Sequence, residues 1–259
     1  GAVPFHMWVP DVYDGAPTSV AAFVGTAPKI AAVVFAFRIL VTGMGTVHSD
    51  WAPMLAILAV ASLVVGNLAA IMQTNIKRML AYSTVSHMGF ILLAFMAGAV
   101  GFTAGLYYAI TYALMAAVSF GVLMVLSTKD IECENIKDLA GLNQRHAWFA
   151  FLMLLSMFSM AGIPPLMGFY AKFGVIMALL KQGHVWLSVF AVIMSLIGAF
   201  YYLRVVKVIY FDAPNHDQPV GSNYAAKFVL TVNAFLLLLW GIMPQTVIDW
   251  CAKALENTL

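Results

Sequence analysis

Two lysines in this chain lie in the middle of long apolar stretches, and each is close to a proline. Lys29 follows Pro28 directly, and Lys172 comes seven residues after the pair Pro164-Pro165. A lysine at the centre of a membrane helix costs about 2.5 to 3.5 kcal/mol on insertion scales, so a lysine in such a place indicates a functional site. Because burial disfavours the charged form, the side chain could release and rebind a proton. We therefore predict that Lys29 and Lys172 carry protons; the alternative is a structural lysine bound by carbonyls that the proline frees.

His87 is the third ionisable residue inside an apolar run, and it lies four residues after Ser83 on the same face of a predicted helix. The ordinary pKa of histidine is close enough to neutrality for the imidazole to relay protons. A histidine in this position can equally be a hydrogen-bonded core residue. Four polar residues of the next apolar run either extend a polar path or only join helices, and we favour the second reading. They are Tyr107, Tyr108, Thr111 and Tyr112.

The other ionisable residues give no sign of a metal or redox centre. All eleven Asp and Glu residues fall in predicted loops or near helix ends, so the predicted membrane interior contains cations without an acidic partner. Cys133 and Cys251 fall on opposite sides of the predicted bilayer and cannot pair, and there is no Cys-x-x-Cys or Cys/His cluster. The net charge of +2 is too small to indicate a nucleic-acid partner. We expect neither a cofactor nor a metal in this chain.

The composition requires membrane helices to position these residues. Of the 259 residues, 63% are hydrophobic and 9% are charged, and the apolar residues come in runs of about twenty, the length that crosses a bilayer. We predict an all-α, polytopic transmembrane helix bundle with about seven full helices after a truncated one, inside which the chain begins. The predicted spans are 18–41, 51–73, 79–98, 102–127, 147–180, 184–210 and 223–249.

The span 147–180 is too long for one straight crossing. The residues that interrupt it are Gly162, Pro164, Pro165 and Gly168. Proline lacks an N–H and collides with the preceding turn, which leaves carbonyls free. We therefore predict a broken helix around residues 162–168, a feature that marks binding sites in transporters. In a separate span, Gly101 and Gly105 form a Gly-x-x-x-Gly pair, which indicates close helix packing.

Positive residues predict the orientation, since Lys and Arg accumulate on the cytoplasmic side of membrane proteins. One side would carry Lys77, Arg78, Lys129, Lys137, Arg145, Arg204, Lys207 and Lys227. The other side would carry only Lys181, Lys253 and, at a helix end, Arg38. The first side, with the long loop 127–146, is predicted to be cytoplasmic, and this loop is either a solvated connector or a docking surface for a neighbouring subunit. Trp8 and Tyr13 are expected in an interfacial aromatic belt.

Four segments together resemble a known family. They are VPFHMWVPDVY (3–13), GAPT (15–18), QTNIKRMLAYS (73–83) and AGIPP (161–165). In order and spacing they resemble the subunit N family of bacterial NADH:quinone oxidoreductase, respiratory complex I, which is an antiporter-like family of proton-translocating subunits. The likeness covers essentially the whole chain.

This resemblance implies a subunit of fourteen helices that contains two inverted repeats of five. Residues 1–50 would end the first repeat, residues 51–210 would form the second, and 223–249 would be the C-terminal helix, all within one transmembrane domain, 1–259. The family's paired glutamate and lysine would lie upstream of Gly1, so we expect the chain to be a fragment.

The resemblance also implies roles for the three buried ionisable residues. Lys29 matches an eighth-helix lysine that links two half-channels. Lys172 matches the lysine of the broken twelfth helix, on the exit side. His87 matches a tenth-helix histidine on the central hydrophilic axis.

We therefore predict a proton-translocating membrane subunit of NADH:quinone oxidoreductase, in which quinone reduction elsewhere drives protons along Lys29, His87 and Lys172. NADH, flavin, iron-sulfur clusters and quinone are expected in other subunits, with no redox site in this chain. Expected partners are the other membrane subunits of complex I, the lipid bilayer and protons, in the bacterial inner membrane. Two alternatives are a subunit of a multisubunit Na⁺/H⁺ antiporter and a structural scaffold that carries no protons.

Overall fold

The computed structural model describes residues 1–127, 132–214 and 224–256. These residues form helices joined by short connections, and the one pairing of extended backbone among them is an isolated antiparallel bridge between Asn75 and Asn135. The prediction of an all-α bundle is confirmed.

Eleven α-helices make up the described chain. They are α1 (Trp8–Gly15), α2 (Thr18–Gly25), α3 (Ala27–Phe37), α4 (His48–Met72), α5 (Ile76–Met96), α6 (Ala99–Leu126), α7 (Leu142–Ala161), α8 (Met167–Lys181), α9 (Val185–Phe211), α10 (Tyr224–Ile242) and α11 (Pro244–Glu256). A π-helical turn, η1 (Arg38–Gly43), and two 3-10 turns, η2 (Gly45–Val47) and η3 (Ile136–Leu139), complete the regular structure.

Six stretches of the described chain are long and apolar enough to cross a membrane. They are Thr18–Gly43, Gly45–Met72, Ile76–Met96, Ala99–Leu126, Val185–Phe211 and Tyr224–Ile242. The fifth predicted span, 147–180, is divided between α7 and α8, as its glycines and prolines predicted. Two other predicted spans are also divided, because Thr26 separates α2 from α3, and the bend before Pro244 separates α10 from α11.

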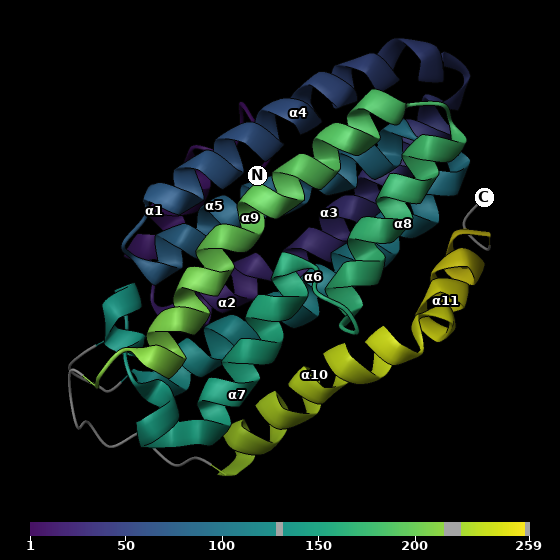
Figure 1. Cartoon of the computed structure of the whole chain (residues 1–259). Coiled ribbons are helices and arrows are strands. Elements are labelled where there is room, and N and C mark those ends of the chain that lie inside the picture. Colours follow the sequence, from purple (N-terminus) through teal and green to yellow (C-terminus); the bar gives the residue numbers. More distant parts are fainter. Residues whose placement is uncertain (128–131, 215–223, 257–259) are drawn as a thin grey trace.

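The helices run roughly side by side, with α4 along one edge of the bundle and α10 along the opposite edge (Figure 1). Helix α5 is the most buried of the six spans and α10 is the least buried. Helix α5 packs on α4, α6, α8 and α1, so its side chains line the middle of the molecule. Any polar residue of α5 must therefore find its partners inside the protein.

Two of the boundaries that differ from the prediction bear on the site. Residues 3–7 form turns and α1 begins at Trp8, so the expected helix at the start of the chain is wrong for the described residues. Helix α5 begins at Ile76, three residues before the predicted span, because the Asn75 side chain accepts a hydrogen bond from the Arg78 backbone N–H at 3.0 Å and caps the helix. Lys77 is consequently a helix residue and not a loop residue.

The Gly-x-x-x-Gly pair of α6 packs against α5, as predicted. A Cβ atom on Gly101 would lie 1.9 Å from the carbonyl oxygen of Ala94, and one on Gly105 would lie 3.3 Å from the Cβ of Ala94. Only glycine at the first position allows the two backbones to approach so closely.

The predicted positive group gathers at one end of the bundle. There the Arg204 guanidinium donates to the carbonyls of Ile71 and Gln73 at 2.8 and 2.7 Å, and Arg78 pairs with Asp11 and Asp14 at 3.1 and 3.2 Å. We call this end, which also holds the described part of the loop 127–146, the loop end. Lys129 lies outside the described residues.

The described part of this loop is packed against the bundle. Cys133, Ile136 and Leu139 are buried, and the backbone N–H of Ile76 donates to the carbonyl of Glu134 at 2.7 Å. A purely solvated connector is therefore the wrong description for residues 132–139, because their apolar side chains and backbone groups are used within the chain.

Candidate functional site

The break between α7 and α8 positions Lys172. Helix α7 ends at Ala161, because the next residue, Gly162, has a φ of +88° that favours glycine, and the carbonyl of Ala161 is left without a helical donor. The Lys172 ammonium donates to this carbonyl at 3.0 Å and to the Ser195 hydroxyl of α9 at 3.0 Å. The freed carbonyl therefore binds this lysine, as the structural alternative predicted, while its role in proton transfer stays a prediction.

His87 lies on α5 between two tyrosines. Its Nδ1 is 2.8 Å from the Tyr108 hydroxyl, and its Nε2 is 2.9 Å from the Tyr202 hydroxyl. The Tyr202 hydroxyl also contacts Ser83, so the shared face of Ser83 and His87 is confirmed. A neutral imidazole donates from one nitrogen and accepts at the other, so this ring can take a proton on one side and give one on the other.

One small cavity joins His87 to Lys172. Both side chains line it, together with Asn67, Ser195 and Tyr202. The space is sufficient for roughly one water molecule. The Asn67 amide donates to the carbonyls of Leu63 and Met194 at 2.9 and 3.1 Å, which holds α4 and α9 together around the cavity. Two of the three predicted proton carriers thus face one polar space.

The polar residues of α6 divide into two groups. Tyr108 binds His87, and the Tyr112 hydroxyl contacts Thr84, one helical turn before His87 on α5. By contrast, Thr111 donates to the carbonyl of Tyr107 in its own helix at 2.8 Å, and the buried Tyr107 hydroxyl has no hydrogen-bond partner. Tyr108 and Tyr112 therefore extend the polar cluster around His87, and the other two do not.

Lys29 lies in the first turn of α3, directly after the break at Thr26. Its side chain is 7% exposed, and its ammonium is 5.8 Å from the centre of the Trp8 ring. Within the described ranges this ammonium has no hydrogen bond or ion pair, so the carbonyl partners of the structural alternative are not found here. The part of the chain that the structure describes contains no direct contact between Lys29 and His87.

Tyr13 lies between these two regions. Its hydroxyl is 3.0 Å from the position that a Cβ on Gly25, the last residue of α2, would occupy, and its ring meets Phe120 edge to face. Tyr13 is fully buried, so its expected place in an interfacial belt is wrong; Trp8, which is 46% exposed, fits that expectation.

Three residues of the cluster were not predicted from the sequence. Asn67 comes from α4, and Ser195 and Tyr202 come from α9. A signal was present, since Ser195 and Tyr202 are seven residues apart and so share one face of an otherwise apolar helix. This spacing did not show which helix that face contacts.

Lys77 forms a buried ion-pair site at the loop end, separate from the cluster around His87. Its side chain is 1% exposed, and its ammonium lies 2.8 Å from Glu132 and 3.2 Å from Glu134. Glu132 also accepts a hydrogen bond from the Thr18 hydroxyl at 3.1 Å. The adjacent Lys77 ammonium holds the pKa of Glu132 below its ordinary value.

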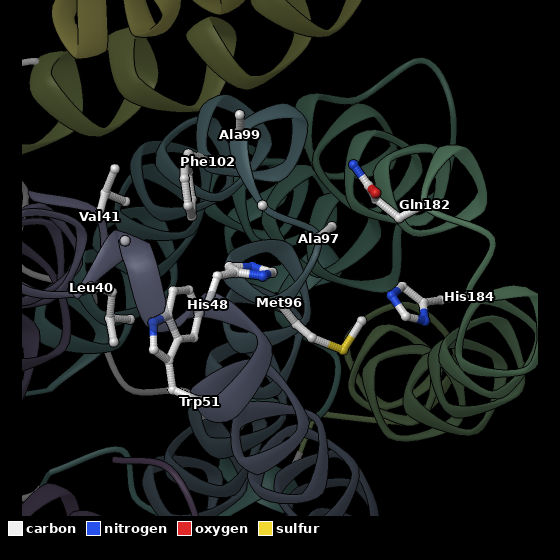
Figure 2. A pocket seen from close by; sticks show the side chains of 12 residues that line it. Leu40, Val41, His48, Trp51, Met96, Ala97, Ala99, Phe102, Gln182 and His184 are labelled. Carbon is white, nitrogen blue, oxygen red and sulfur yellow. The ribbon is translucent and has the colours of Figure 1, made fainter.

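A larger pocket lies at the other end of the bundle. Its volume is about 740 Å³, including space open to solvent, and its lining includes His48, Trp51, Met96, Phe102 and His184. Figure 2 shows Met96 between the two histidines, and no residue of the His87 cavity lines this pocket. The described residues contain no group of three His, Cys, Asp or Glu side chains that could hold a metal ion, and both cysteines are free.

Residues 1–198 match the family described as NADH:quinone oxidoreductase/Mrp antiporter, TM. The chain belongs to the NADH:quinone oxidoreductase/Mrp antiporter transmembrane family. The resemblance seen in the sequence is thereby confirmed.

Curated members of this family are close in sequence. The chain is 84% identical over 260 residues to NADH-quinone oxidoreductase subunit N of Neisseria gonorrhoeae, and 53% identical over 259 residues to the subunit of the same name of Nitrosomonas europaea. Each alignment covers all of this chain and 54% of the relative. The chain therefore spans about half the length of the curated relatives it matches.

Solved structures of the family share the fold. A chain of respiratory complex I from Thermus thermophilus with bound aureothin superposes with a TM-score of 0.84 at 32% identity, over 96% of this chain and 55% of that one. A chain of the Mrp complex from Dietzia sp. superposes with a TM-score of 0.88 at 22% identity, over 99% of this chain and 56% of that one. At this lower identity the second likeness shows the fold alone.

Proposed function

We propose that this chain is part of a proton-translocating membrane subunit of NADH:quinone oxidoreductase, in which protons move through Lys29, His87 and Lys172. The observation that carries the proposal is the cavity that His87 and Lys172 share. Among the described residues the Lys172 ammonium is held only by neutral oxygens, and His87 is an imidazole between two hydroxyls, so a single water could pass a proton between them.

Electrostatic interaction would couple quinone reduction to the movement of protons. No carboxylate pairs with Lys29 or Lys172 in the described part of the chain. In an interior of low dielectric, an unpaired ammonium responds strongly to a charge that changes several ångströms away. Quinone reduction elsewhere in the complex would thus act on these lysines through neighbouring charged groups and not through a redox centre in this chain.

The relatives support the proposed assembly and location. The proposed partners are the other membrane subunits of complex I and the lipid bilayer of the bacterial inner membrane. NADH, flavin, iron-sulfur clusters and quinone would be bound by other subunits. The loop end would face the cytoplasm, because it gathers the positive residues.

The proposed division of the chain follows the same family. Residues 1–50 would end one inverted repeat, residues 51–210 would form the next, and residues 223–249 would be the C-terminal helix. The break at Thr26 in the first part and the break at Gly162 in the second support this division, since each is close to a buried lysine.

The test uses full-length protein in inverted membrane vesicles. Lys172→Met and Lys29→Met should each leave complex assembly intact while NADH-driven proton uptake and the coupled NADH oxidation fall sharply. Lys181→Met is the matched control, because Lys181 is an exposed residue at the end of the helix that carries Lys172. Wild-type uptake in both test variants would reject the proton path and favour a scaffold without transport.

A second candidate is a subunit of an Na⁺/H⁺ antiporter, since the family includes Mrp antiporters and the fold of an Mrp chain superposes closely. Transported Na⁺ favours carboxylate and carbonyl ligands, and none of the carboxylates among the described residues lines the cavity of His87 and Lys172. Proton uptake that requires Na⁺ in the same vesicles would support this candidate.

A further inference from the structure

Lys77 is buried although it lies in the first turn of its helix. Unlike Lys29 and Lys172, its ammonium is paired with carboxylates, and both partners reach solvent: the side chains of Glu132 and Glu134 are 38% and 46% exposed. The three side chains together carry one net negative charge. This group therefore connects water at the loop end to the protein interior and attracts cations to that point.

Lys77 also begins the polar face of α5. Thr84 lies seven residues further along, which is two helical turns or about 10 Å, and faces the same side of the helix. Thr84 contacts Tyr112, whose ring centre is 5.0 Å from the ring centre of His87. The face that starts at the ion pair thus ends at the proposed proton path.

Tyr13 lies beside α5 near Thr84, and its neighbour Asp14 accepts a hydrogen bond from Asn75 at 2.7 Å, directly before the turn that holds Lys77. The Tyr13 hydroxyl faces those of Thr84 and Tyr112, but it is fully buried and makes no hydrogen bond in the described structure. A buried hydroxyl without a partner marks a place where an ordered water is expected. Thr84 and Tyr112 contact each other directly, so the Tyr13 hydroxyl is the group of this region that is left to bind a water.

We propose that Lys77, Glu132 and Tyr13 form the opening of the polar path at the loop end of the bundle. The proposal rests on the function proposed above and adds the point where protons enter or leave. The Glu132 carboxylate would take a proton from bulk water and return it to an internal water. Tyr13 would accept that proton and release its own to Thr84 or Tyr112, so each hydroxyl gains one proton and loses one. Lys77 positions Glu132 and stays charged throughout.

Direct hydrogen bonds do not join the ion pair at the loop end to the cluster around His87. Among the described residues no hydrogen bond joins Lys77 to Tyr13, so water must complete that step. Loss of the Tyr13 hydroxyl should therefore interrupt transfer without breaking a contact of the fold.

The test compares full-length Tyr13→Phe and Glu132→Gln with Asp11→Asn, in assembled complex in vesicles. Asp11 is the matched control, because it forms an ion pair at the same end, with Arg78, but its side chain is 75% exposed and faces outward. Tyr13→Phe and Glu132→Gln should lower proton uptake per assembled complex several-fold and raise its solvent isotope effect. Glu132→Asp should restore uptake, and Asp11→Asn should match the parent.

Two results would show that Lys77, Glu132 and Tyr13 do not form the opening of the polar path. One is parent-like uptake in both Tyr13→Phe and Glu132→Gln while Lys172→Met is defective, which would leave the proton path intact and place its opening elsewhere. The other is an equal loss in Asp11→Asn, which would assign the effect to packing at the loop end. Parent-like uptake in Lys172→Met would instead reject the function on which this proposal rests.

Discussion

Three buried tyrosines provide a graded test of the cluster around His87. Their hydroxyls differ in the number of hydrogen bonds they make: Tyr202 contacts both His87 and Ser83, Tyr108 contacts His87 alone, and Tyr107 has no partner. All three are at most 2% exposed. Replacing each by phenylalanine removes one oxygen atom and leaves the ring, so the expected losses of stability depend on the bonds and not on the packing.

The expected losses of stability follow from the hydrogen bonds that each substitution breaks. A hydrogen bond between membrane helices contributes on average about 0.6 kcal/mol, and leaving a buried polar atom unpaired costs about 1 to 3 kcal/mol. Tyr202→Phe leaves Nε2 of His87 and the Ser83 hydroxyl without this partner, so we expect a loss of about 2 to 4 kcal/mol in the free energy of unfolding. For Tyr108→Phe we expect about 1 to 2 kcal/mol, and for Tyr107→Phe a change within about 0.5 kcal/mol of zero.

The assay is reversible unfolding of the full-length subunit in mixed micelles, with helicity as the readout. Proton uptake in vesicles should follow the same order, since Tyr202 and Tyr108 hold both nitrogens of His87. If Tyr107→Phe destabilises the protein as much as Tyr202→Phe, the hydrogen bonds around His87 are not what holds these helices together.

Three further predictions concern packing and charge. Gly101→Ala should cost at least about 1 to 3 kcal/mol because its Cβ meets a backbone carbonyl of α5, whereas Gly105→Ala should be tolerated, as thermal unfolding would measure. Glu132 has a lowered pKa, so its contact with Lys77 stabilises the loop above the ordinary value of 4.5 and is lost as pH falls through the lowered value. Hydrogen exchange over residues 132–139, corrected for the intrinsic effect of pH, should accelerate in the parent as pH falls through the lowered pKa of Glu132. The same fall in pH should not accelerate it in Glu132→Gln. Arg204→Met should increase exchange at the end of α4, whose carbonyls it binds.

Several features of the fold followed from the sequence because their causes are local. Apolar runs long enough to cross a bilayer predicted the helices, and glycine and proline between residues 162 and 168 predicted the break, since proline disrupts whichever helix contains it. The same local reasoning found Lys172 and His87 as buried ionisable residues, and both are buried in the structure. The roles of these residues in proton transfer stay predictions.

The sequence did not predict which of two neighbouring tyrosines binds His87. Tyr107 and Tyr108 are adjacent in the same helix, yet one hydroxyl has no partner and the other binds His87. Successive residues of a helix point about 100° apart, so the direction in which α5 packs on α6 decides which tyrosine joins the cluster. The sequence carries no local record of that direction.

By itself the sequence determined which segments are helices, where one helix breaks and which charges lie in apolar surroundings, because hydropathy and backbone restriction belong to short segments. Only the tertiary structure decided that His87 meets Tyr202, 115 residues away, and that Lys77 is buried against Glu132, 55 residues away. Each of these contacts requires two helix or loop segments to pack in one register, and that register depends on the summed packing of the whole bundle.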